Sequence, residues 1–115
     1  MNIQDMEHSA DRAATLLASM ANTRRLMVLC HLMEGERKVG ELAACVGLSQ
    51  SALSQHLGRM RAQGLVEARR AGQAVYYRLA GHEVARVLEA LHGLYCVAPE
   101  GEASAGGAVP VSAPA

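Results

Sequence analysis

The chain has 115 residues, about the length of one domain. Half of its residues are apolar and 19% are charged, which excludes an intrinsically disordered composition and favours a folded core. No apolar run approaches the ~20 residues that cross a membrane, and the acidic N-terminal residues do not fit a secretory signal. The composition therefore predicts a small cytoplasmic protein with no membrane partner.

The formal net charge is zero, but the charges are unevenly distributed along the chain. Residues 24–78 carry nine basic and four acidic side chains, a net +5, whereas residues 1–23 carry −2 and residues 79–115 carry −3. A basic middle region between two acidic ends indicates a nucleic-acid-binding surface in the middle of the chain.

The first two helices are predicted from apolar residues at helical spacing. Ser9 is expected to cap the first helix, and Asn22 or Thr23 the second, which ends near Gly35. The expected inward positions are Ala13, Leu16, Leu17 and Met20 in the first helix and Leu26, Leu29, Cys30 and Met33 in the second.

Two further helices are joined by a tight turn that contains a capping serine. The third is expected over about 39–46, ending at Gly47, and the fourth over about 50–63, ending at Gly64. Their apolar faces are Val39, Leu42, Ala43 and Val46 in the third helix and Leu53, Leu57 and Met60 in the fourth. Two short helices packed across a tight turn are typical of a helix-turn-helix.

A β-hairpin and a last helix complete the predicted fold. The strands are expected over 66–70 and 74–79, around the turn Ala71-Gly72-Gln73, and the last helix over about 82–96. The predicted class is mainly α with a β-hairpin wing, a winged helix-turn-helix of order α-α-α-α-β-β-α over residues 8–97. Residues 98–115, rich in Ala, Gly, Pro and Ser, are expected to form a disordered tail.

The outward face of the fourth helix is nearly free of acid and rich in short hydrogen-bonding groups. Gln and Ser side chains can pair with base edges or phosphates, and Arg can donate two hydrogen bonds to guanine. The hairpin adds basic residues around its tip. The predicted DNA contacts are Gln50, Ser51, Ser54, Gln55, His56 and Arg59 on the helix and Arg69, Arg70 and Gln73 on the hairpin.

The segment 39–57, VGELAACVGLSQSALSQHL, resembles the ArsR/SmtB family of winged-helix repressors, as do Gly64-Leu65-Val66 and Val75-Tyr76-Tyr77-Arg78-Leu79. The resemblance covers the whole predicted folded part. It implies a homodimer joined through the first and last helices, which binds a near-palindromic double-stranded operator and releases it when a ligand is sensed.

The two metal sites known in that family do not match this sequence. The third-helix site needs a Cys-x-Cys pair, but here only Cys45 is present. The last-helix site needs two histidines eleven residues apart with acidic partners, whereas His82 and His92 are ten apart, with Ala80 in the place of one acid. The resemblance therefore gives no support to either metal site.

Cys30 and Cys96 resemble the dithiol branch of the family, of the SqrR, BigR and HlyU type. That resemblance implies that a disulfide or polysulfide bridge between the two cysteines, formed by reactive sulfur species or other oxidants, releases the operator. Cys45 has no counterpart in that pair. The simpler interpretation is that Cys30 is an inert packing residue, because it falls on the expected apolar face.

Three other functions are alternatives to this thiol switch. A Zn²⁺-responsive repressor would use Cys30, His92 and Cys96, of which the last two lie at i and i+4. A redox-blind winged-helix DNA-binding module would not use the cysteines at all. A thiol enzyme is disfavoured because the sequence has neither a cysteine-containing catalytic loop nor a phosphate-binding loop, so we expect no enzyme, cofactor or resident metal.

Overall fold

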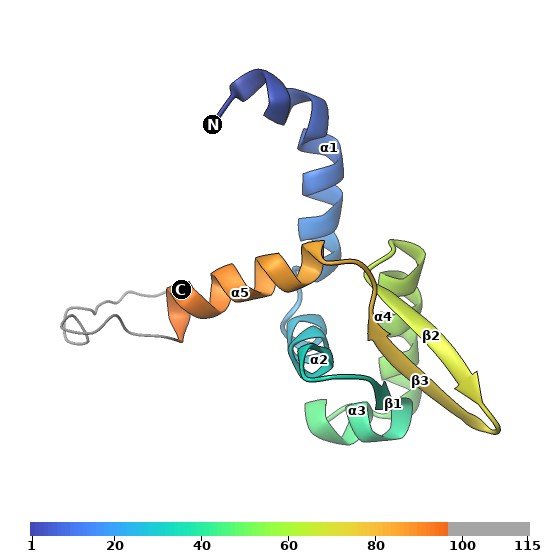
Figure 1. Cartoon of the computed structure of the whole chain (residues 1–115). Helices are drawn as coiled ribbons and strands as arrows, with labels where there is room; N and C mark the ends of the chain where they lie inside the picture. Colours follow the sequence, from blue (N-terminus) through green and yellow to red (C-terminus); the bar gives the residue numbers. More distant parts are fainter. Residues whose placement is uncertain (97–115) are drawn as a thin grey trace. The chain divides into compact units, whose positions relative to one another are not determined.

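The computed structural model describes residues 1–96, which form five helices and three strands (Figure 1). Residues 1–85 form one compact unit, and a second unit begins at residue 86. The element order agrees with the predicted winged helix-turn-helix, with one added strand. The domain boundaries at residues 8 and 97 stay predictions, and the predicted tail lies outside the described residues.

Helix α1 (Ile3–Met20) begins seven residues earlier than the sequence suggested. Its N-cap is Asn2, whose side-chain oxygen accepts a hydrogen bond of 2.8 Å from the Gln4 N–H, so the prediction that Ser9 caps this helix is wrong. Only Met20 is buried, and most of α1 stands away from α2–α4 (Figure 1). Because this part of α1 is exposed, the polar residues in its first two turns are not buried, and the spacing of apolar residues does not mark where the helix begins.

Helix α2 (Thr23–Met33) is capped by Asn22, one of the two predicted residues. Its buried residues are Val28, Leu29 and Leu32, whereas Cys30 and Met33 are exposed. The predicted inward face was therefore wrong for Cys30 and Met33. Apolar residues surround much of this helix, so two overlapping stripes fit the helical period, and only the packing partners decide which one is buried.

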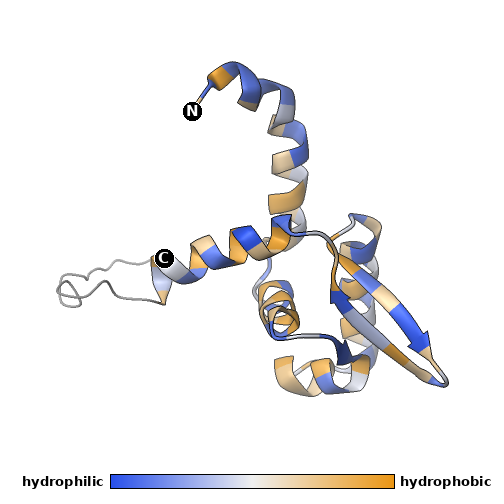
Figure 2. Ribbon diagram, in the orientation of Figure 1, coloured by the Kyte–Doolittle hydropathy of each residue, from blue (hydrophilic) through white to orange (hydrophobic). Residues whose placement is uncertain are grey.

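The helix-turn-helix core is formed by α3 (Val39–Val46) and α4 (Gln50–Ala62), and the predicted inward positions of both helices are buried except Val39, which is half-buried. Gly47 ends α3 with a φ of 69°, a left-handed conformation that suits glycine. The Leu48 N–H donates to the Ala43 carbonyl at 3.0 Å and closes the turn. Hydrophobic residues dominate α2 and α3 (Figure 2). The buried core of the two helices consists of Leu42, Ala43, Val46, Leu53, Leu57 and Met60.

The wing is a three-stranded antiparallel sheet of order β1-β3-β2. β2 (Val66–Ala71) and β3 (Ala74–Leu79) form the predicted hairpin, closed by Gly72 with a φ of 65° and Gln73. β1 (Arg37–Lys38) pairs with β3 at Tyr77 and Tyr76 and was not predicted. Two charged residues have no period-two pattern, so this strand is defined by its pairing rather than by its sequence.

Helix α5 (Glu83–Tyr95) matches the predicted last helix to within one residue at each end. Its last residues Leu94 and Tyr95 are exposed at 72% and 81%. Within residues 1–96, no helix is both long enough and apolar enough to cross a membrane.

Candidate nucleic-acid interface and cysteine positions

The outward face of α4 is built from the cap of the helix onward. The Ser49 hydroxyl accepts a hydrogen bond of 3.1 Å from the Ala52 N–H, which fixes the first turn. With Leu53, Leu57 and Met60 buried behind it, the opposite face carries polar side chains. None of these side chains bonds to another described residue, and α4 contains no acidic residue. The exposed predicted contacts on α4 are Gln50, Ser51, Ser54, Gln55 and Arg59.

His56 differs from the other predicted contacts on α4, because it is half-buried and already engaged. Its Nδ1 accepts a hydrogen bond of 3.1 Å from the Nε–H of Arg25 on α2, and the Arg25 Nη1 also donates to the Ser19 carbonyl at 3.3 Å. Burial, with the positive charges of Arg25 and Arg59, lowers the pKa of His56 below its ordinary value. His56 therefore joins α4 to α2, and its contact with DNA stays a prediction.

Arg24 holds the turn of the helix-turn-helix, a role that sequence reasoning missed. Its guanidinium donates hydrogen bonds to the carbonyl oxygens of Val46 and Gly47, at the end of α3. These carbonyls have no partner within their own helix, so a cation there satisfies them and opposes the negative end of the helix dipole. Arg24 and Val46 are 22 residues apart, so no local sequence pattern indicates the contact.

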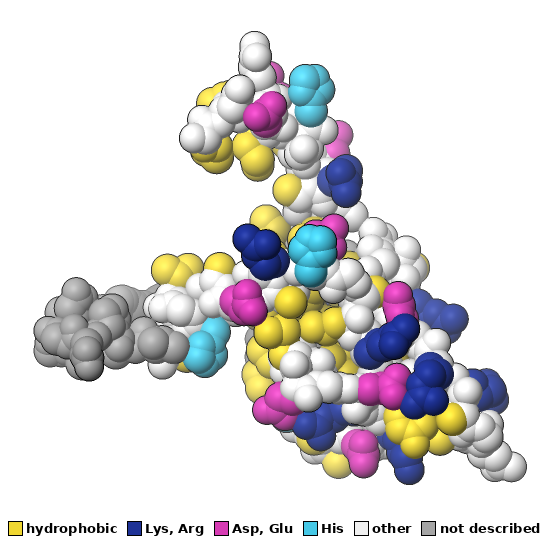
Figure 3. Space-filling view, viewed as in Figure 1, with side chains coloured by type: hydrophobic (Ala, Val, Ile, Leu, Met, Phe, Trp, Pro, Cys, Tyr) yellow, Lys and Arg dark blue, Asp and Glu magenta, His cyan; other side chains and the backbone are white. Residues whose placement is uncertain are grey.

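The basic residues of the hairpin are not equivalent. Arg69 forms a two-point ion pair with Glu36, with Nη2–Oε1 at 2.6 Å and Nε–Oε2 at 3.1 Å. The hydrogen bond from Arg69 lowers the pKa of the Glu36 carboxyl. Arg70 is exposed and takes part in none of the ion pairs found in residues 1–96. The neutral Gln73 is also exposed. Basic and acidic side chains alternate over the hairpin in Figure 3, so its net positive charge is smaller than its arginines suggest.

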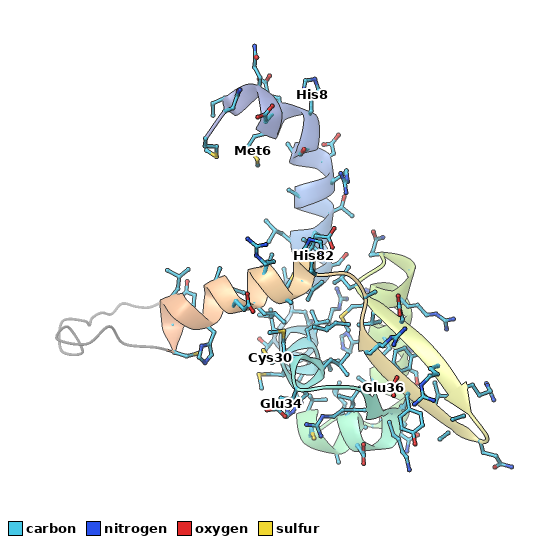
Figure 4. All side chains as sticks on the ribbon, in the orientation of Figure 1. Met6, His8, Cys30, Glu34, Glu36 and His82 are labelled. Carbon is cyan, nitrogen blue, oxygen red and sulfur yellow. The ribbon has the colours of Figure 1, made fainter. Side chains whose placement is uncertain are left out.

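The three cysteines are exposed thiols. Cys30 lies on α2 in the first unit (Figure 4), Cys45 lies on α3, and Cys96 directly follows α5, where its N–H donates to the His92 carbonyl at 2.8 Å. Among residues 1–96, no group of three or more His, Cys or acidic side chains is arranged to hold a metal ion. Exposure makes each thiol accessible to a small reactant, which the buried position expected for Cys30 would have prevented.

Residues 22–68, from the cap of α2 into β2, match the family described as "Bacterial regulatory protein, arsR family". The transcriptional activator HlyU of Vibrio cholerae serotype O1 is 51% identical over 98 residues, which cover 85% of this chain and 91% of HlyU. The chain belongs to the ArsR family. This assignment confirms the resemblance read from segment 39–57.

Solved structures of ArsR-family relatives have the same fold. Reduced HlyU from Vibrio cholerae aligns with a TM-score of 0.76 at 50% identity, over 82% of this chain and 99% of that structure. The repressor BigR from Xylella fastidiosa aligns with a TM-score of 0.80 at 41% identity, over 84% and 99%. The homodimeric winged helix-turn-helix DNA-binding domain of Mb0332 from Mycobacterium bovis aligns with a TM-score of 0.69 at 37% identity, over 78% and 84%.

Proposed function

We propose that this ArsR-family regulator is a homodimeric repressor that binds operator DNA through α4 and the hairpin tip, and that a bridge between Cys30 and Cys96 releases it. The observation that carries DNA binding is the acid-free outer face of α4, whose five exposed polar or basic side chains have no partner in the described part of the chain. Such a face presents unsatisfied donors and acceptors to base edges.

Exposed apolar residues on both terminal helices support the homodimer. Ile3, Met6 and Leu17 of α1 are 63%, 42% and 54% exposed, and Leu94 and Tyr95 of α5 are more exposed still. Apolar side chains gathered on a helix face outside the core favour contact with another protein surface. A two-fold dimer would place two copies of α4 at half-sites about one turn of DNA apart.

The thiol step requires an accessible thiolate and a second thiol that can reach it. A thiolate of Cys30 or Cys96 attacks the outer sulfur of an organic persulfide, becomes Cys–S–SH and releases the organic thiol. The other thiolate attacks the inner sulfur, which forms the disulfide and releases hydrogen sulfide, so the added sulfur takes up the two electrons. Two persulfidated cysteines instead lose one hydrogen sulfide and leave a trisulfide. With hydrogen peroxide, the two thiols give the disulfide and two waters.

A bridge changes operator affinity only if it favours one dimer shape over another. A coupling free energy of about 1–3 kcal/mol corresponds to a roughly 5–150-fold change in affinity. A direct disulfide requires Cα atoms about 4.4–6.8 Å apart, and a polysulfide spans more. Whether the protein responds better to a persulfide or to hydrogen peroxide therefore indicates how closely the two cysteines approach.

The test begins with duplexes selected from a random pool by the reduced protein. We expect persulfide-treated wild type to lose at least tenfold in affinity for the selected duplex, and dithiothreitol to restore it. Cys30→Ser and Cys96→Ser should abolish the response. Cys45→Ser is the matched control, because Cys45 is also an exposed thiol, and it should respond like wild type. Intact mass distinguishes a disulfide from a bridge with added sulfur.

Three results would contradict parts of the proposal. If the reduced wild type selects no duplex, DNA binding is wrong. If the Cys30→Ser, Cys96→Ser double variant responds to persulfide, the switch is wrong, and if no thiol reagent changes wild-type affinity, the chain is a redox-blind module. A stoichiometric Zn²⁺ content in the reduced protein, lost in Cys96→Ser, would favour the metal-responsive alternative. A selected duplex inserted at a reporter promoter shows whether binding represses transcription.

A further inference from the structure

Three residues form a ladder across the wing sheet. Lys38 of β1 pairs with Tyr76 of β3, and Tyr76 pairs with Arg69 of β2. Residues directly opposite each other in a sheet share a face, so the tyrosine ring lies between two cations. The Lys38 Nζ is 5.9 Å and the Arg69 Cζ is 4.6 Å from the ring centroid.

Glu36 completes this ladder from outside the hairpin. It lies just before β1 (Figure 4), and both of its carboxylate oxygens accept hydrogen bonds from the Arg69 guanidinium on β2. The Glu36 side chain is 27% exposed and the Arg69 side chain 50%. Two parallel hydrogen bonds fix the plane of the guanidinium, so Arg69 is held against the Tyr76 ring rather than extended into solvent.

The contact ties the hairpin to the helix-turn-helix. β1 runs directly into α3, and Lys38 is the N-cap of that helix, with its N–H donating to the Glu41 carboxylate at 3.3 Å. A bond from Glu36 to β2 therefore joins the second strand of the hairpin to the start of the helix that packs behind α4. Movement of the hairpin relative to α3 would break this bond.

Arg70 occupies a different position in the same strand. It pairs with Val75 and lies on the opposite face of the sheet from Arg69, because successive residues of a strand alternate between faces. Arg70 is exposed and carries no ion pair among the described residues. The two neighbouring arginines thus differ in whether their charge is already compensated.

We propose that Glu36 is a positioning residue for DNA recognition: it keeps Arg69 on Tyr76, fixes the hairpin relative to α3, and leaves Arg70 as the arginine of the hairpin that contacts phosphate. The inference rests on the proposed DNA binding. It replaces the earlier expectation that Arg69 and Arg70 contact DNA alike.

The test is the salt dependence of affinity for the selected duplex, measured for wild type, Arg69→Ala, Arg70→Ala and Glu36→Gln. We define the salt slope as the decrease in log K per unit increase in log salt concentration, and each phosphate contact adds about 0.9 to it. We expect Arg70→Ala to lower the slope by about 0.9 and Arg69→Ala to leave it unchanged. Glu36→Gln should raise the slope, since the released Arg69 can reach phosphate, and should reduce discrimination between the selected duplex and an unrelated one.

A conservative variant separates the two roles of Arg69. Lysine keeps a point charge for phosphate but lacks the planar fork that binds Glu36. We therefore expect both Arg69→Lys and Arg69→Ala to lose discrimination between the selected duplex and an unrelated one. If Arg69→Ala lowers the slope as much as Arg70→Ala, or if Glu36→Gln changes neither slope nor discrimination, the inference is overturned while the proposed function stands. If the folded wild type binds no duplex, the proposed function fails and the inference with it. Circular dichroism and thermal unfolding verify that each variant is folded.

Discussion

Helix α4 and the β2–β3 hairpin both carry the side chains that we propose to contact DNA, but these side chains are held in opposite ways in the two elements. On α4, the polar side chains are exposed and without partners, while the apolar side of the helix is fully buried. On the hairpin, the residues are at most half-buried beyond Val66, and two arginines are paired with Glu36 and Glu67. The helix presents its groups from a rigid core, whereas the hairpin depends on ion pairs for its position.

This difference shows why the charge counted from a sequence overestimates the positive charge that is left unpaired on the surface. The middle of the chain carries a net +5. Part of that charge is used inside the fold, because Arg24 caps α3, Arg25 contacts His56, and Arg69 binds Glu36. The donors of these three arginines are therefore already bonded within the protein, which leaves fewer basic groups available to contact DNA.

The largest effect is expected from the core behind α4. Leu57→Ala removes a fully buried side chain and should lower the free energy of unfolding by about 2–5 kcal/mol. Val75→Ala in the hairpin is the comparison, and should cost about 1 kcal/mol or less because Val75 is half-buried. Urea unfolding measures both. Equal losses would show that the hairpin is as firmly packed as α4 and would remove the contrast.

The next largest effect is expected on affinity for DNA, from a polar side chain on the outward face of α4. Gln55→Ala should remove a base contact and cost about 1–3 kcal/mol for the selected duplex, with little change for an unrelated one. Arg61→Ala is a matched control in the last turn of α4, with an exposed charge that was not among the predicted contacts. Fluorescence anisotropy measures the affinity of each variant for the selected and the unrelated duplex. A uniform loss on both duplexes would assign Gln55 to phosphate rather than to a base.

Much of the fold could be predicted from local sequence patterns. Leu53, Leu57 and Met60 repeat at helical spacing and are buried as predicted, and Gly47 and Gly72 mark the ends of elements because both adopt a positive φ. These signals lie within a few residues of the structure they determine, so the chain order of helices and hairpin follows from them.

The parts that could not be predicted depend on residues far apart in the chain. Glu36 and Arg69 are 33 residues apart, and neither shows in its own neighbourhood that it is paired. β1 has only two residues and exists because β3 pairs with it. The exposure of Cys30 likewise depends on which side of α2 meets the core. Sequence patterns therefore identified the candidate DNA-binding residues but not which of the basic ones remain available.

A smaller effect, on both stability and affinity for DNA, is expected from the loss of Arg24. Arg24→Ala removes the hydrogen bonds to the carbonyls of Val46 and Gly47, and should lower the free energy of unfolding by about 1 kcal/mol. Because these bonds hold the turn before α4, affinity for the selected duplex should fall as well. Arg12→Ala, an exposed arginine on α1, is the control and should change neither quantity. A stability loss with unchanged affinity would show that the turn tolerates the missing cap.

The smallest effect expected is the pH dependence contributed by His56. Its folded-state pKa lies below the unfolded value of about 6.5, so the unfolded chain binds more protons between the two values. The stability that neutral His56 contributes is therefore complete above about pH 6.5 and is lost as the pH falls through the folded-state pKa. Protonation also removes the Nδ1 lone pair that accepts from Arg25. His56→Asn keeps an acceptor without titrating, so its Tm should fall less than that of wild type between pH 7.5 and 5.5, whereas His8→Asn, on exposed α1, should behave like wild type. Identical pH profiles for His56→Asn and wild type would place the titrating group elsewhere and leave the Arg25 contact as a purely geometric link between α2 and α4.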